Sequence, residues 1–214
     1  MLQVLRYTFN PFQENTYVVY DDISKDCLIF DPGMHTGAER QAFADELARH
    51  GLRPVRLINT HGHLDHVFGN RFVYDQYGLL PEIHAGDLAL LQKMPAIAAA
   101  YGLPPMEASP EPARLLEAGS ETILGGERMD LLFTPGHSPG SVSFYFPDAG
   151  FVIVGDVLFY GSIGRTDLPG GDHETLLRSI REQLFPLGDA VRVLSGHGPG
   201  TDIGHERRHN PFLS

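Results

Sequence analysis

The stretch Thr60-His61-Gly62-His63-Leu64-Asp65-His66 decides how the rest of the chain is interpreted. It follows a short apolar run at residues 55–59 and precedes a helical pattern at residues 70–77. Strand, polar loop, helix is the usual order in which the edge of a sheet presents reactive side chains. We therefore expect this stretch to carry the chemistry of the chain.

Four residues of this stretch are of the types that bind metal ions when thiolates are absent. On an extended segment, His61 and His63 project to the same side and can converge on one point. If the chain then turns into a helix, Asp65 and His66 can face a second point a few ångströms away. A purely structural role does not explain such a dense cluster, so it predicts a metal site.

Three further residues occur in one local pattern: an apolar strand, a glycine, then a candidate ligand. They are His137 after Gly136, Asp156 after Gly155, and His197 after Gly196. Taken alone, each is a loop histidine or a turn aspartate. Together with the cluster, they are expected to complete the metal site, and the two carboxylate oxygens of Asp156 could bridge two ions.

The pattern of strands and helices predicts an α/β fold in which two sheets pack face to face with helices outside. Strands are expected at residues 2–8, 15–21, 27–30, 55–59, 128–133, 141–146, 151–155 and 191–194, and helices at 36–50, 70–77 and 174–184. Residues 94–116 are interpreted as short helical pieces and loops. One domain is expected over residues 1–214.

The composition is that of a globular protein, with 42% hydrophobic and 20% charged residues and one cysteine, Cys27. The first ten residues lack the pattern of a signal peptide, and no apolar run is long enough to span a membrane, so a cytoplasmic protein is expected. A net charge of −11 argues against a nucleic-acid partner. The basic tail at residues 206–209 is interpreted as a solvated helix face. The sequence does not indicate an oligomeric state.

The motif at residues 60–66, with its three distant partners, resembles the metallo-β-lactamase superfamily along essentially the whole chain. The resemblance implies a four-layer αβ/βα sandwich and two divalent metal ions. Zinc is expected, with iron and manganese as alternatives. The first ion would be held by His61, His63 and His137, and the second by Asp65, His66 and His197, with Asp156 bridging the two.

Within that superfamily, the chain looks like the short, glyoxalase II-like branch. The segment 155–164, followed by Arg165, resembles the family segment that ends in a glutathione-binding lysine, and Arg165 would bind a substrate carboxylate. Where that family has a tyrosine two residues later, this chain has Asp167. The resemblance implies hydrolysis of a small thioester by a metal-bound hydroxide, with Asp65 as both ligand and catalytic residue that orients the nucleophile.

Other functions of the same fold stay open at this point. The main alternative is a persulfide dioxygenase that uses one iron, bound by His61, His137 and Asp156. A nuclease is disfavoured by the acidic charge balance, and a non-catalytic metal module by the expected position of the site at open strand ends.

Overall fold

The computed structural model describes residues 1–213, which divide into two compact units. Unit 1 spans Met1–Leu116, and unit 2 begins at Glu117. Each unit is built around one mixed sheet. The expectation of a single domain stays a prediction.

The sheet of unit 1 has the strand order β1-β2-β3-β4-β5-β6. The strands β1, β2 and β3 pair antiparallel, and β4, β5 and β6 continue the sheet in parallel with β3. Their bounds are Leu2–Phe9, Glu14–Asp21, Asp26–Phe30, Arg53–Ile58, Pro81–His84 and Arg114–Leu116. The strands predicted at residues 2–8, 15–21 and 27–30 are therefore confirmed.

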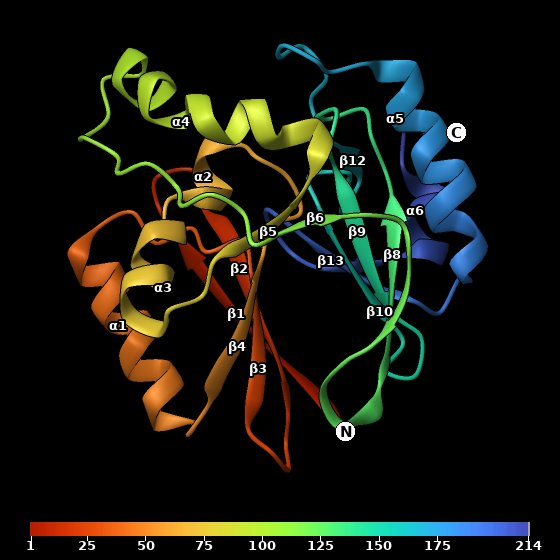
Figure 1. Cartoon of the computed structure of the whole chain (residues 1–214). Helices are drawn as coiled ribbons and strands as arrows, with labels where there is room; N and C mark the ends of the chain where they lie inside the picture. The colour runs from red at the N-terminus through yellow and green to blue at the C-terminus, as the bar shows by residue number, and fades with distance from the viewer. Residues whose placement is uncertain (214) are drawn as a thin grey trace. The chain divides into compact units, whose positions relative to one another are not determined.

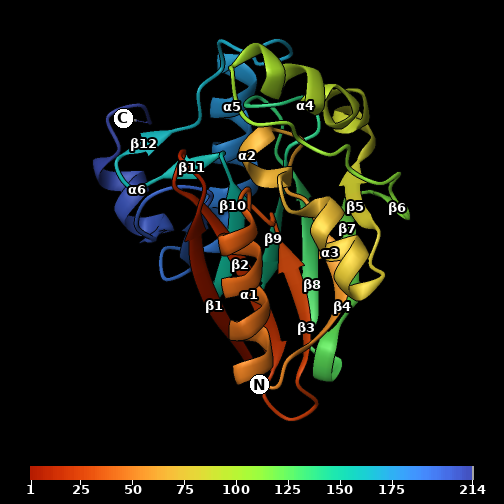
Figure 2. The ribbon, with the colours of Figure 1, turned by 90° about the vertical axis from the view of Figure 1, so that its left-hand side faces the viewer.

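Two helices of unit 1, α1 (Gly37–Arg49) and α3 (Asn70–Tyr77), lie on the same face of this sheet (Figures 1 and 2). Their apolar positions explain why: Phe43, Leu47 and Val73 are buried together with strand residues of the sheet. The helix α1 begins at a capping box formed by Thr36 and Glu39. A short helix, α2 (Leu64–Val67), lies within the motif that opened the sequence analysis.

The interpretation of residues 94–116 as short pieces and loops is wrong in part. The helix α4 runs unbroken over Leu88–Ala100 although Pro95 lies inside it, and β6 closes the segment. Leu91, Met94 and Ala98 are buried along one side of the helix. Burial of these residues outweighs the hydrogen bond that proline removes.

The sheet of unit 2 has the order β14-β13-β10-β9-β8-β7, and a separate hairpin pairs β11 with β12. From β7 to β14 the bounds are Gly119–Thr122, Arg128–Phe133, Val142–Phe146, Phe151–Gly155, Leu158–Phe159, Ser162–Ile163, Arg192–Ser195 and Thr201–Asp202. Strand β10 pairs antiparallel with β9 and parallel with β13.

The helices of unit 2, α5 (His173–Ser179) and α6 (Ile203–His209), pack on its sheet. Asp172 caps α5 by accepting a hydrogen bond from the backbone N–H of Thr175 at 2.7 Å. A wider turn at Ile180–Leu184 continues the helix. The core beneath contains Val152, Val154, Leu176, Ile180, Leu184, Val193 and Ile203.

In each unit, the segments that carry the candidate ligands gather at one edge of the sheet. In unit 1, β3 and β4 are parallel, so Asp31 and His61 both follow strands that end at the same edge. In unit 2, β8, β10 and β13 run in one direction, so His137, Asp156 and His197 also follow strands that end at a common edge. This topology brings together side chains that are far apart in the sequence.

Among residues 1–213, no helix is both long and apolar enough to cross a membrane.

Candidate metal centre

In unit 1, the motif loop places three histidine rings close together at the start of α2. The ring centroid of His61 lies 4.8 Å from that of His63 and 4.2 Å from that of His66. The carboxylate Oδ2 of Asp65 lies 3.7 Å from Nε2 of His66. His61 and His66 are almost fully buried. The loop therefore concentrates nitrogen and oxygen donors, as predicted.

Neighbouring side chains fix the backbone of this loop. The N–H of Gly62 donates to Oδ2 of Asp87 at 2.8 Å, and Asn10 Nδ2 donates to the carbonyl of Asp65 at 3.1 Å. Asp87 is itself fully buried. A side chain at Gly62 would come within 3.1 Å of the Asp87 carbonyl oxygen, so glycine permits this close approach. The histidine rings are thus held on a rigid support.

Asp31 is a residue of this site that the sequence analysis missed. Its Oδ1 accepts the backbone N–H of Thr60 at 2.7 Å, and its Oδ2 accepts the Thr60 hydroxyl at 2.6 Å. The same Oδ2 lies 3.0 Å from Nδ1 of His66. Asp31 directly follows the strand that ends at Phe30, as Asp156 directly follows the strand that ends at Gly155. That shared pattern is the signal that could have identified it.

These contacts define which nitrogen each ring presents. Because the Thr60 hydroxyl donates to Asp31, it accepts from Nδ1 of His61, which lies 3.0 Å away. His66 likewise donates from Nδ1 to Asp31. In both rings, the lone pair therefore resides on Nε2, which is the arrangement of a metal-binding histidine held by an outer partner.

In unit 2, Asp156 lies between two histidines. Its Oδ2 is 3.6 Å from Nε2 of His137 and 3.5 Å from Nε2 of His197. Two ligand atoms about 2 Å from one ion at a tetrahedral angle are separated by roughly 3.4 Å. These distances fit a carboxylate that shares an ion with each histidine. His137 donates from Nδ1 to the carbonyl of Arg165 at 2.8 Å, so its lone pair also resides on Nε2.

A cysteine thiolate is not among the candidate metal ligands. Burial raises the pKa of the Cys27 thiol to about 12, so it is a structural residue of the unit 1 core. Imidazole nitrogens and carboxylate oxygens fit a divalent ion such as zinc, iron or manganese. Each unit thus carries part of a donor set, and the grouping of all seven predicted ligands around one pair of ions stays a prediction.

Arg165, which is predicted to bind a substrate carboxylate, follows Asp156 by nine residues in the sequence, and its side chain is exposed. Its guanidinium forms two hydrogen bonds of 2.7 Å with Asp167, one to each carboxylate oxygen. The Arg165 guanidinium lowers the pKa of Asp167 to about 2. The aspartate that replaces the tyrosine expected from the family resemblance thus pairs with the arginine.

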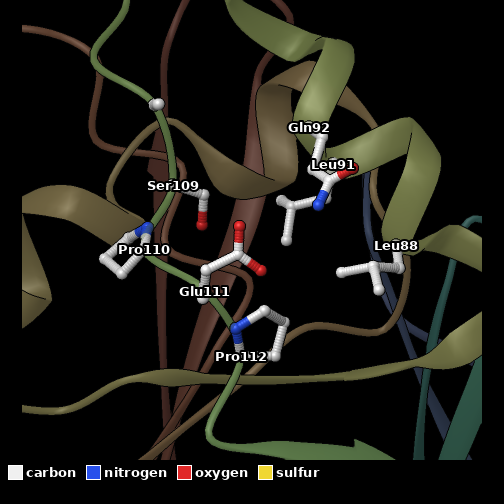
Figure 3. A pocket seen from close by; sticks show the side chains of 8 residues that line it. Leu88, Leu91, Gln92, Ser109, Pro110, Glu111 and Pro112 are labelled. Atoms are coloured by element: carbon white, nitrogen blue, oxygen red, sulfur yellow. The ribbon is translucent and has the colours of Figure 1, made fainter.

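A pocket in unit 1 lies between α4 and the segment at residues 108–112 (Figure 3). Ser109 in its wall accepts a hydrogen bond of 2.9 Å from Asn70, which exchanges hydrogen bonds with Asn59. Asn59 in turn donates to the carbonyl of His66. The pocket is therefore linked to the motif loop, but its walls contain no histidine and one carboxylate, that of Glu111.

The sequence profile of the Metallo-beta-lactamase superfamily matches residues 9–197. The chain belongs to this superfamily. The match begins in β1 and ends at His197, so it includes every predicted ligand.

Relatives within the superfamily cover nearly the full length of the chain. The probable metallo-hydrolase YqgX of Bacillus subtilis is 41% identical over 98% of this chain and 96% of its own length. The hydroxyacylglutathione hydrolase GloC of Haemophilus influenzae is 38% identical over 95% of this chain and 94% of its own. The chain is thus similar to metal-dependent hydrolases.

Solved structures confirm the α/β metallo-β-lactamase fold predicted from the sequence. BLEG-1, a B3 metallo-beta-lactamase, has a TM-score of 0.90 and 38% identity over 99% of this chain and all of its own. TTHA1623, in a di-iron-bound form, has a TM-score of 0.85 and 38% identity over 98% of this chain and all of its own. The chain therefore has the fold of a metal-binding superfamily.

Replacing Asp31 with asparagine should weaken binding of the ion that His66 helps to hold by about 10- to 100-fold, the usual effect of losing an outer-shell partner. Asparagine tolerates the left-handed backbone of this residue, whose φ is 48°, so the turn should survive. Competition with a chelator of known affinity measures the change. Asp26→Asn, at the opposite end of β3, is the matched control. Equal metal affinity in the Asp31 variant would remove Asp31 from the site.

Proposed function

We propose that the chain is a binuclear metal-dependent hydrolase that acts on thioesters of the hydroxyacylglutathione type. The likeness to GloC over nearly the full length of both chains carries this proposal. The ligand set is proposed to combine both units: His61, His63 and His137 for one ion, Asp65, His66 and His197 for the other, and Asp156 for both. Zinc is the expected ion.

The position of Asp156 supports a pair of ions. One of its carboxylate oxygens is at nearly the same distance from Nε2 of His137 and of His197, which are assigned to different ions. A carboxylate so placed suits a bridging ligand, because its negative charge stabilises two neighbouring cations. The fixed Nε2 lone pairs of His61 and His66 support the same arrangement in unit 1.

When bound, divalent ions lower the pKa of a coordinated water to about 7 and polarise a carbonyl group. The chain's own residues would then orient the reactants. The carboxylate of Asp65, 15% exposed, would accept a hydrogen bond from the attacking water and fix its direction. The rigid loop around Gly62 keeps the histidines in place, so little reorganisation accompanies the reaction.

Thioesters suit a site with these residues. The leaving group is a thiolate, whose conjugate acid has a pKa near 8.5, so it departs without prior protonation. An amine leaving group requires a general acid. All histidines and aspartates of the site except Asp31 are assigned as ligands, and Asp31 accepts hydrogen bonds from Thr60 and His66, so none is reserved to donate that proton.

The Arg165–Asp167 pair supports a zwitterionic substrate. It presents a cation and an anion side by side on an exposed segment that directly follows the Asp156 loop. Glutathione carries two carboxylates and one ammonium group, so Arg165 and Asp167 can each bind a group of opposite charge. Binding a carboxylate at Arg165 requires that Asp167 release it or turn toward the ammonium group.

The test is hydrolysis of lactoylglutathione by the zinc-loaded protein, with Arg165→Ala as the diagnostic variant. We expect turnover by the unaltered protein and a several-fold increase in KM with little change in kcat for the variant, since Arg165 binds substrate distant from the thioester. Arg128→Ala is the matched control, because Arg128 forms the same two-bond pair with Asp130 on β8.

Two further assays separate the rival activities. Oxygen uptake with glutathione persulfide by the iron-loaded protein, without thioester hydrolysis, would indicate a dioxygenase. Hydrolysis of a chromogenic cephalosporin with no activity on the thioester would indicate a β-lactamase, the activity in the name of BLEG-1. Either result would overturn the thioesterase proposal.

A further inference from the structure

The helix α6 carries two histidines, His205 and His209, four residues apart. Residues at this spacing lie on one face of a helix, and here the ring centroids are 5.0 Å apart. With the intervening residues, the sequence is His-Glu-Arg-Arg-His, which matches the H-E-x-x-H motif of a helical zinc site. In such a site, the histidines bind the ion and the glutamate acts as a general base.

The glutamate of this sequence has a different task. Glu206 is fully buried, and its Oε1 accepts the Thr201 hydroxyl at 2.6 Å. Its Oε2 accepts the N–H of Gly161 at 3.0 Å and the amide of Asn210 at 2.7 Å. Oε1 thus accepts from β14, and Oε2 accepts from the β11–β12 hairpin and from Asn210, so both oxygens are occupied. Glu206 cannot serve as a base, so the two histidines offer binding without hydrolytic chemistry.

The two imidazole rings are available to a cation. In the described residues, no hydrogen bond uses a ring nitrogen of His205 or His209, and the nearest carboxylate oxygen to His205 Nε2 is that of Glu206 at 4.0 Å. That distance is too long for a hydrogen bond.

The positive charges of the same helix are compensated elsewhere. The guanidinium of Arg207 lies 3.4 Å from the Asp189 carboxylate, and that of Arg208 lies 3.0 Å from it. Arg207 also donates to the carbonyl of Phe185. These contacts direct both cations toward Asp189 and reduce the repulsion that a metal ion would meet at the histidines.

The ring of Tyr160 restricts the orientation of the His205 ring. The two rings stack, with centroids 5.0 Å apart and planes 13° apart. Tyr160 lies between β11 and β12, next to Gly161, whose N–H donates to Glu206. Figure 2 shows this hairpin beside α6. Because His205 is already held in one orientation, less rotamer entropy is lost when an ion binds.

We propose that His205 and His209 form a surface site for a divalent transition-metal ion. Imidazole pairs suit zinc, nickel and copper, with Cu²⁺ bound most tightly, and water would complete the coordination. The site is independent of the proposed thioesterase function, since none of its residues belongs to the predicted ligand set.

The experiment titrates Cu²⁺ into the full chain already loaded with zinc. Copper is followed by electron paramagnetic resonance and retained zinc by elemental analysis. We expect one bound Cu²⁺ with two nitrogen ligands and no loss of zinc. His205→Ala and His209→Ala should each weaken that binding more than tenfold. His173→Ala, which removes an exposed histidine of α5, is the matched control and should leave it unchanged.

Three results would overturn the proposal. Release of zinc in proportion to the copper bound would assign the copper to the zinc sites. A spectrum with a single nitrogen ligand would exclude the pair. Unchanged copper affinity in both His205→Ala and His209→Ala would place the ion elsewhere on the protein.

Discussion

Replacing Asp156 with alanine should lower kcat/KM by more than ~100-fold, the upper end of the effect of losing an outer-shell partner. We expect a larger loss than for an outer-shell partner, because Oδ2 of Asp156 lies within 3.6 Å of the Nε2 atoms of His137 and His197, which are themselves predicted ligands. Removing this carboxylate takes away the negative charge proposed to hold both ions. No carboxylate would then offset the positive charge of the ions beside His137 and His197. Metal content should therefore fall together with activity.

The measurement combines hydrolysis kinetics, metal content per chain and the melting temperature. Asp156→Asn is the informative companion, since it keeps the size of the side chain and removes the charge. We expect it to lose metal nearly as severely as alanine. Asp148→Asn, in the exposed turn between β9 and β10, is the control and should retain both metal and activity. Full metal content in Asp156→Ala would show that Asp156 is a turn residue and not a ligand.

The ends of the eight predicted strands lie within two residues of the observed bounds, because these ends are marked by a sharp change of residue type. The short strands β5, β6, β7, β11, β12 and β14 were not predicted. The helix α3 begins and ends where predicted, since its apolar spacing is regular and Gly78 follows in a left-handed conformation with φ 71°. The strand β8 also has the predicted bounds. Because His137, Asp156 and His197 directly follow or lie just beyond predicted strands, local pattern was sufficient to predict that they lie at strand ends, and Asp156 lies close to both histidines.

Long-range relations could not be predicted in the same way. Asp31 acts on Thr60 and His66, which are 29 and 35 residues further along the chain, and only the parallel pairing of β3 with β4 brings them together. The helix α4 was missed because Pro95 is a strong local signal, while the burial that offsets it depends on the fold. Local propensity is a weak guide wherever tertiary packing decides.

Replacing Gly164 with alanine should destabilise the protein and reduce its activity together. A Cβ at this residue would lie 1.9 Å from the carbonyl oxygen of Asp156 and 3.2 Å from Nδ1 of His137. The first distance is a hard overlap with backbone, so the segment must move. Forcing extra atoms into a packed site costs about 1–3 kcal/mol. For a chain of this size, the melting temperature should fall by roughly 2–12 °C.

The activity should fall because the next residue, Arg165, supplies the carbonyl that accepts the hydrogen bond from His137 Nδ1. Moving that carbonyl weakens the contact that fixes the tautomer of the ring, an outer-shell effect of about 10- to 100-fold. Gly37→Ala is the matched control, since a Cβ there meets nothing within 4 Å at the start of α1. Thermal melting and kcat/KM measure both effects. If the Gly164→Ala protein has the melting temperature and kcat/KM of the control, the Asp156 loop adjusts freely to the added methyl group. The close packing of Gly164 against Asp156 and His137 would then have no role in catalysis.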